Sequence, residues 1–129
     1  MADSRNISLS ELQIALMRVL WNRGETSTAE MAAAMAEDRG LAHTTVATLL
    51  TRLEKRGVVT QRRDGRQLLY RANVEESDVR RSMVADLIGS LFAGDANQLV
   101  AHLVQESEIE PGDLARIRGR LARGGGDED

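Results

Sequence analysis

The sequence predicts a mainly α-helical protein in which three helices precede a short β-hairpin and further helices follow it. Apolar residues recur at helical spacing on both sides of residues 58–71. Within that stretch, residues 58–62 and 67–71 are strand-like runs, and Arg63-Asp-Gly-Arg66 between them contains an Asp-Gly pair that favours a hairpin turn. Three helices followed directly by a hairpin are the element order of a winged helix-turn-helix, with the hairpin as the wing.

The first predicted helix, Ser10–Asn22, has an apolar face made of Leu12, Leu16, Val19 and Leu20. Its start fits a capping box, formed either by Ser10 with Gln13 or by Ser8 with Glu11. The second helix, residues 28–38, follows another capping box, Ser27-Thr-Ala-Glu30.

The third predicted helix, Ala42–Arg56, has the pattern of a DNA recognition helix. Its buried face is expected to contain Val46, Leu49, Leu50 and Leu53. Short polar groups stand outside near its start and cations further along, which suits the major groove. The wing arginines are expected along the phosphate backbone. The predicted DNA-binding residues are His43, Thr44, Thr45, Thr48, Arg52, Lys55, Arg62, Arg63 and Arg66. His43 either reaches a phosphate or stays in solvent.

The charge distribution supports a polyanionic partner, although the whole chain carries a net charge of −3. Residues 1–72 contain eleven Lys and Arg against eight Asp and Glu, whereas residues 73–129 contain six against twelve. A basic segment in an acidic protein is the electrostatic pattern expected of a protein that binds double-stranded DNA.

Beyond residue 73, three further helices are predicted, and we expect them to pair two chains. A short region with one aromatic residue has too little core to bury its own apolar stripe, so a second copy is expected to cover it. The predicted dimerisation residues are Val79, Met83, Val84, Leu87, Ile88, Leu91, Leu99, Leu103, Leu114 and Ile117. The expected organisation is a DNA-binding domain over residues 1–73, a helical dimerisation domain over 74–123 and a disordered tail over 124–129.

Other classes of function find little support in the sequence. The chain has no cysteine, two histidines and no recognisable catalytic or nucleotide-binding motif, so we expect no enzyme activity, metal or cofactor. We expect no signal peptide and no membrane span, and the expected location is the cytoplasm. Two alternatives stay open: a winged-helix regulator that senses a small molecule, and a winged-helix module that binds only proteins.

Two stretches resemble the penicillinase-repressor (BlaI/MecI-type) family. Residues 7–21, Ile-Ser-Leu-Ser-Glu-Leu-Gln-Ile-Ala-Leu-Met-Arg-Val-Leu-Trp, are similar to its first helix, and residues 41–57 are similar to its recognition helix. Landmarks of its dimerisation region resemble residues 75–78 and 97–100. The resemblance implies a homodimeric repressor on inverted-repeat operators, relieved when a membrane metalloprotease sensor cleaves the C-terminal region. It implies DNA contacts at Thr44, Thr45, Thr48, Arg52, Arg63 and Arg66.

Two features depart from the family pattern. Antibiotic-responsive members are cut at an Asn-Phe bond, and the matching position here is His102-Leu103, the candidate cleavage site. The copper-responsive branch uses C-terminal cysteines, which this chain lacks. The resemblance therefore implies the activity but not the inducing signal.

Overall fold

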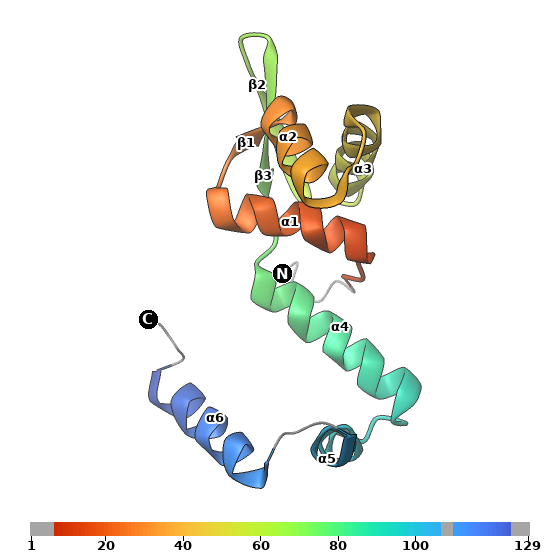
Figure 1. Cartoon of the computed structure of the whole chain (residues 1–129), viewed down its shortest axis with the longest axis vertical. Coiled ribbons are helices and arrows are strands. Elements are labelled where there is room, and N and C mark those ends of the chain that lie inside the picture. Colours follow the sequence, from red (N-terminus) through yellow and green to blue (C-terminus); the bar gives the residue numbers. More distant parts are fainter. Residues whose placement is uncertain (1–6, 107–109, 125–129) are drawn as a thin grey trace. The chain divides into compact units, whose positions relative to one another are not determined.

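The structure, a computed structural model, describes residues 7–106 and 110–124 (Figure 1). It confirms the predicted fold class: a mainly helical chain with a small antiparallel sheet. The elements are α1 (Glu11–Arg23), β1 (Thr26–Ser27), α2 (Thr28–Arg39), α3 (His43–Lys55), β2 (Val59–Asp64), β3 (Gln67–Ala72), α4 (Glu76–Leu91), α5 (Ala96–Glu106) and α6 (Pro111–Gly124). The chain forms two compact units that divide inside α4, one up to Met83 and one from Val84.

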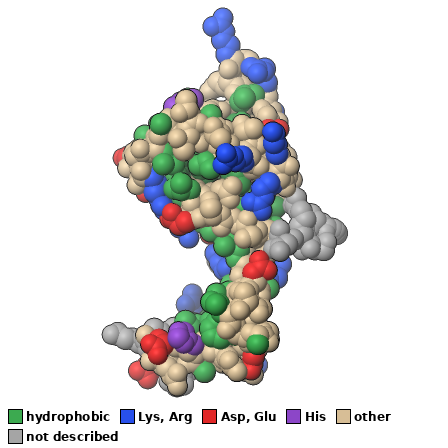
Figure 2. Space-filling model, turned by 90° about the vertical axis from the view of Figure 1, so that its right-hand side faces the viewer, with side chains coloured by type: hydrophobic (Ala, Val, Ile, Leu, Met, Phe, Trp, Pro, Cys, Tyr) green, Lys and Arg blue, Asp and Glu red, His purple; other side chains and the backbone are tan. Residues whose placement is uncertain are grey.

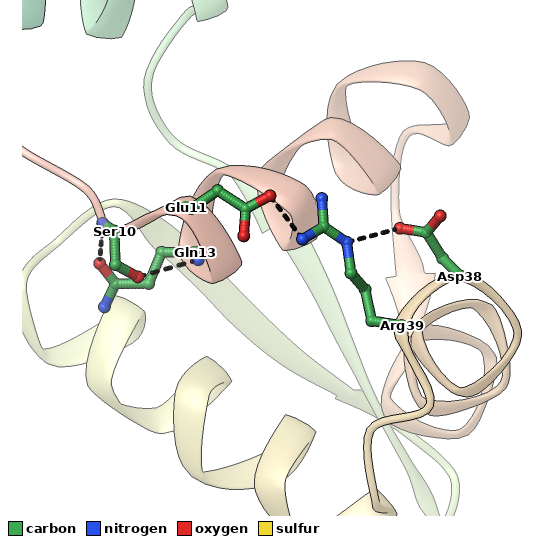
Figure 3. Close-up of polar contacts among 5 residues, drawn as sticks. All are labelled: Ser10, Glu11, Gln13, Asp38 and Arg39. Carbon is green, nitrogen blue, oxygen red and sulfur yellow. Dashed lines mark hydrogen bonds and ion pairs between the residues drawn. The ribbon is translucent and has the colours of Figure 1, made fainter.

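Capping interactions determine where α1 and α2 begin and where α3 ends. Ser10 caps α1 with Gln13, and Ser27 caps α2 with Glu30, each pair forming a reciprocal capping box (Figure 3 for Ser10). Of the two starts considered for the first helix, the structure uses Ser10. At the end of α3, Gly57 has a φ of +79°, and the Val58 amide donates to the Leu53 carbonyl, as in a Schellman cap.

An arginine at the end of α2 ties that helix to the start of α1. The Arg39 guanidinium forms ion pairs with Glu11 in the first turn of α1 and with Asp38 beside it, where the distance is 3.1 Å (Figure 3). Both partners raise the pKa of Arg39, chiefly through the hydrogen bond to Glu11. These groups are largely exposed, so the contribution of the ion pairs to stability is small.

The wing, which consists of β2, β3 and the loop between them, extends past the helices of the first unit (Figure 1). The strands run to Asp64 and Ala72, slightly longer than predicted, and only Gly65 and Arg66 lie between them. Gly65, at the first loop position, has a φ of +64°, which glycine adopts most easily and which matches a II′ hairpin turn.

The short strand β1 was not predicted from the sequence. Thr26 pairs with Tyr70 and Ser27 with Leu69, so β1 lies beside β3 in a sheet of order β1-β3-β2. Ser27 is therefore both the second residue of the edge strand β1 and the N-cap of α2.

The core of the first unit is mostly aliphatic, in a chain of which only 2% of the residues are aromatic. It gathers Leu and Met side chains of α1 and α2, the inner face of α3, and two valines at the start of β2. The fully buried side chains include Leu16, Met17, Met31, Met35, Val46, Leu50 and Leu53. Tyr70 is buried in this core, and Trp21, half-buried, donates a hydrogen bond of 2.9 Å to the Val74 carbonyl.

The first turns of α4 belong to this core. Val79 is buried in it, Met83 packs against it, and the Ile7 amide donates a hydrogen bond of 2.9 Å to the Ser82 hydroxyl. For this reason the structural division at Met83 falls ten residues after the boundary expected at residue 73.

The second unit contains the end of α4 followed by α5 and α6. Gly94, with a φ of +83°, lies in the turn between α4 and α5, and Pro111 opens α6. Gly124 ends α6, so it is not part of a tail, and residues 125–129 lie outside the described residues. From Val84 onward, no side chain that the structure describes is fully buried.

Candidate nucleic-acid interface

The outward side of α3 carries the predicted polar and basic residues on one exposed surface. Val46, Leu50 and Leu53 are buried beneath it. The outer face of α3, as we name this surface, consists of the exposed residues His43, Thr44, Thr45, Thr48, Arg52 and Lys55. The Thr51 hydroxyl, in contrast, donates to the Ala47 carbonyl at 3.0 Å and is occupied within the helix.

The start of α3 is capped differently from those of α1 and α2. Its N-cap is Ala42, whose methyl group cannot accept a hydrogen bond, and no side chain caps it. The first amide groups of α3 therefore keep donors available for an external acceptor, next to His43 and Thr44. A phosphate oxygen is such an acceptor.

The hairpin register assigns the wing arginines to different faces. Residues opposite each other in an antiparallel pair share a face, and neighbours along a strand point to opposite faces. Arg63 lies opposite Leu68, which packs on the core, and shares that face with Gln61. The Gln61 amide donates to the Glu54 carboxylate of α3 at 2.8 Å. Arg63 is therefore on the face of the wing that looks toward α3, and Arg66 is in the loop.

Arg62 is on the other face and is bound to a carboxylate. Its guanidinium donates two hydrogen bonds, each of 2.8 Å, to the two carboxylate oxygens of Glu25, just before β1. These hydrogen bonds lower the pKa of Glu25, and the charges of Arg62 and Arg71 act in the same direction. Sequence reasoning did not single out Glu25, because nothing local marks a partner 37 residues away.

The other cations of the interface have no such partner. In the described part of the chain, no ion pair engages Arg52, Lys55, Arg63 or Arg66. Glu54, the acid nearest to Arg52 and Lys55 in sequence, is hydrogen-bonded to Gln61 instead. Figure 2 shows blue Lys and Arg side chains over the hairpin end of the first unit. The outer face of α3 and the wing thus present four cations that form no ion pair within the described residues: Arg52, Lys55, Arg63 and Arg66.

The predicted dimerisation residues that the structure describes fall into three groups: packed into the first unit, partly exposed, and exposed. Val79 and Met83 pack into the first unit, as described above. Ile88 and Leu99 are partly exposed, and the side chain of Leu114 lies outside the described part of the chain. The exposed members are Val84, Leu87, Leu91, Leu103 and Ile117, and Val100 joins them.

The candidate cleavage site lies inside α5. His102 is exposed, and its ring centroid is 6.1 Å from that of Phe92. His102 and Leu103 are both in the regular part of the helix, several residues before its end at Glu106.

Other kinds of site are not found within the described residues. No three His, Asp or Glu side chains among them are placed to hold a metal ion. None of the helices described is long and apolar enough to span a membrane. A cavity of about 590 Å³ between α1 and α2 is lined by charged side chains such as Arg18, Glu37 and Asp38. Its lining differs from the apolar walls typical of a small-molecule site.

Comparison with known proteins places this chain in a family of repressors. The model of the penicillinase repressor family matches residues 9–123. The methicillin resistance regulatory protein MecI of Mammaliicoccus sciuri is 24% identical over 119 residues, which cover 92% of this chain and 97% of MecI.

Solved structures of the repressor BlaI resemble part of this chain. The DNA-binding domain of BlaI is 27% identical, with a TM-score of 0.53, and the match covers 57% of this chain and 90% of that domain. The monomeric form of Bacillus licheniformis BlaI in complex with the blaP half-operator is 27% identical, with a TM-score of 0.51 and the same coverage. Fold, element order and the nearly full-length family match together show that the chain belongs to the penicillinase repressor family.

Proposed function

We propose that this chain represses transcription as a homodimer that binds inverted-repeat operator DNA. The outer face of α3 enters the major groove, and Arg63 and Arg66 of the wing bind phosphates beside it. The observation that carries the proposal is the uncompensated charge of Arg52, Lys55, Arg63 and Arg66 around an exposed row of threonines. The related BlaI has been solved in complex with the blaP half-operator, which supports operator DNA as the partner.

Selection from a random duplex library tests this function, because the protein itself then picks out its operator sequence. We expect the purified protein to enrich an inverted repeat with half-site centres about 34–36 Å apart, one turn of DNA. Enrichment of no common sequence, with binding equal on all duplexes, would contradict sequence-specific repression. Absence of salt-dependent DNA binding would favour the protein-interaction alternative.

Dimerisation through the second unit is the second part of the proposal. Val84, Leu87 and Leu91 share one side of α4 and are exposed, Leu91 to 69%. An exposed apolar row on a helix costs free energy in water, and a second copy of the same surface buries it through a two-fold contact. Sedimentation at micromolar concentration should therefore report a dimer.

Relief of repression by proteolysis is the third part. A cut between His102 and Leu103 would separate α6 and the end of α5 from the rest of the chain. Because this bond is within a helix, α5 has to open locally before a protease can bind it as an extended strand. A chain ending at His102 reproduces the product. We expect it to bind the selected operator more weakly than the full chain, because the cut removes Leu103 and Ile117 from the predicted dimer surface while Val84, Leu87 and Leu91 remain. Operator binding equal to that of the full chain would exclude this site as the release point.

A further inference from the structure

We infer that Glu25 withholds Arg62 from DNA and thereby limits the affinity of the wing for any duplex. The inference goes beyond the proposed function and rests on it, because it assumes that the wing lies along the phosphate backbone. It makes Glu25 a positioning residue that acts through Arg62. Sequence reasoning placed Arg62 among the DNA-binding residues, and the structure gives that cation a partner within the protein.

The geometry of the pair supports this role. Both oxygens of Glu25 accept from Arg62, at 2.8 Å each, so the planar guanidinium is held in a fork-to-fork arrangement. This is the same geometry with which arginine binds a phosphate, so Glu25 occupies the edge of Arg62 that a phosphate would use. Glu25 comes just before β1, and Arg62 is in β2, on the far side of β3.

A second arginine shows that Glu25 faces a locally basic surface. The antiparallel register of β1 and β3 places Glu25 next to Arg71, and Thr60 pairs with Arg71 across the hairpin. A small cavity of about 240 Å³ is lined by Glu25, Thr60, Arg62 and Arg71, among others. Without the carboxylate, this strip of the wing would present two unpaired cations to a polyanion.

The ion pair of Arg62 and Glu25 is exposed to solvent, so a substitution can break it without disturbing the core. The side chain of Arg62 is 58% exposed and that of Glu25 is 30% exposed. Neither side chain belongs to the core cluster, so loss of the carboxylate should free Arg62 rather than unfold the unit. A repressor gains from such a restraint, because every phosphate contact strengthens binding to all duplexes alike and adds no sequence information.

The test is a salt titration of Glu25→Gln on random-sequence duplex DNA, with the full-length chain. Each additional phosphate contact steepens the plot of log K against log salt by about 0.9. If the two proteins bind equally at 1 M salt, this slope corresponds to about eightfold tighter binding at 0.1 M salt. We expect this increase for Glu25→Gln. The double variant Glu25→Gln/Arg62→Gln should return to the slope of the unchanged protein, because the freed cation is gone.

Glu37→Gln is the matched control. Glu37 is exposed on α2, and its substitution removes the same charge away from the wing. It should leave the slope unchanged, and thermal unfolding followed by circular dichroism should show that all three variants stay folded.

Three results would overturn the inference. An unchanged slope in Glu25→Gln would show that Arg62 does not reach DNA even when released. A steeper slope that persists in the double variant would assign the new phosphate contact to another cation. An equally steep slope for Glu37→Gln would show that the effect comes from the change in net charge alone. If the unchanged protein shows no salt-dependent binding to DNA, the proposed function fails together with the inference. Normal binding with no effect of Glu25→Gln overturns the inference alone.

Discussion

The first unit surrounds its apolar side chains, whereas the second unit leaves them at the surface. In the first unit, α1, α2, α3 and the sheet bury a continuous cluster that includes Leu16, Met35 and Leu50 without measurable exposure. Among the described residues from Val84 onward, none is buried, and Leu87 and Leu91 are exposed. The first unit therefore has a closed apolar core, and the second has an exposed apolar surface that the proposed dimer would bury.

The largest effect is expected from a substitution that disrupts the dimer contact of the second unit. We expect Leu87→Asp to make the protein monomeric, because it puts an unpaired charge where a dimer buries apolar area. Losing one of two linked half-site readers should weaken operator binding by roughly 10²–10⁴-fold. Sedimentation and operator titration measure the two effects.

Ala85→Asp provides the matched control for this substitution. It adds the same charge to an exposed position of α4 outside the apolar row and should leave the dimer intact. If Leu87→Asp stays dimeric, the second unit does not pair the chains through this row. The exposure of its apolar side chains would then have no role in dimerisation.

The next largest effect compares one kind of substitution in the two units. Leu50→Ala empties part of the closed core and should cost roughly 2–5 kcal/mol of unfolding free energy. Leu91→Ala in the monomeric Leu87→Asp background should cost less than about 0.5 kcal/mol, because that side chain is already in water. Urea unfolding measures both variants. A large loss for Leu91→Ala in the monomer would mean that the second unit has a core of its own.

Local patterns in the sequence were sufficient to predict the elements but not their distant partners. Apolar spacing and capping boxes operate within one or two helical turns, so α1, α2, α3 and the wing were predicted close to their observed bounds, and three further helices were predicted after residue 73. The strand β1 was missed because its two residues become a strand only through pairing with Tyr70 and Leu69, far along the chain.

The same limit applies to the candidate sites. Periodicity identifies the apolar side of α4, but it does not say what covers that side. Val79 and Met83 lie on the predicted stripe, yet they pack within their own chain. Likewise, the basic run of the wing indicated cations without showing that Glu25 neutralises one of them. Which cation is available for DNA depends on strand register, and a local motif does not contain that information.

A smaller effect should separate specificity from dimerisation. Thr48 is exposed on the outer face of α3, and the structure gives its hydroxyl no partner among the described residues. We expect Thr48→Ala to lose roughly 1–3 kcal/mol of preference for operator over random duplex. Non-specific binding and sedimentation should stay unchanged. Thr51→Ala is the matched control, because that hydroxyl is bound to the Ala47 carbonyl. Equal losses on both duplexes would assign Thr48 to the backbone or to no contact.

The smallest expected effect is within the wing, where neighbouring arginines should differ. Arg66 is in the hairpin loop without an ion pair, so Arg66→Ala should flatten the plot of log K against log salt by about 0.9, or about eightfold in affinity at 0.1 M salt. Arg63→Ala should act alike on operator and random duplex.

Arg62→Ala removes the same charge from the same hairpin, but that charge is already bound to Glu25. The slope of log K against log salt should therefore change little in Arg62→Ala. Equal flattening by all three substitutions would show that the ion pair opens when DNA arrives, and that the wing binds as a uniform basic surface.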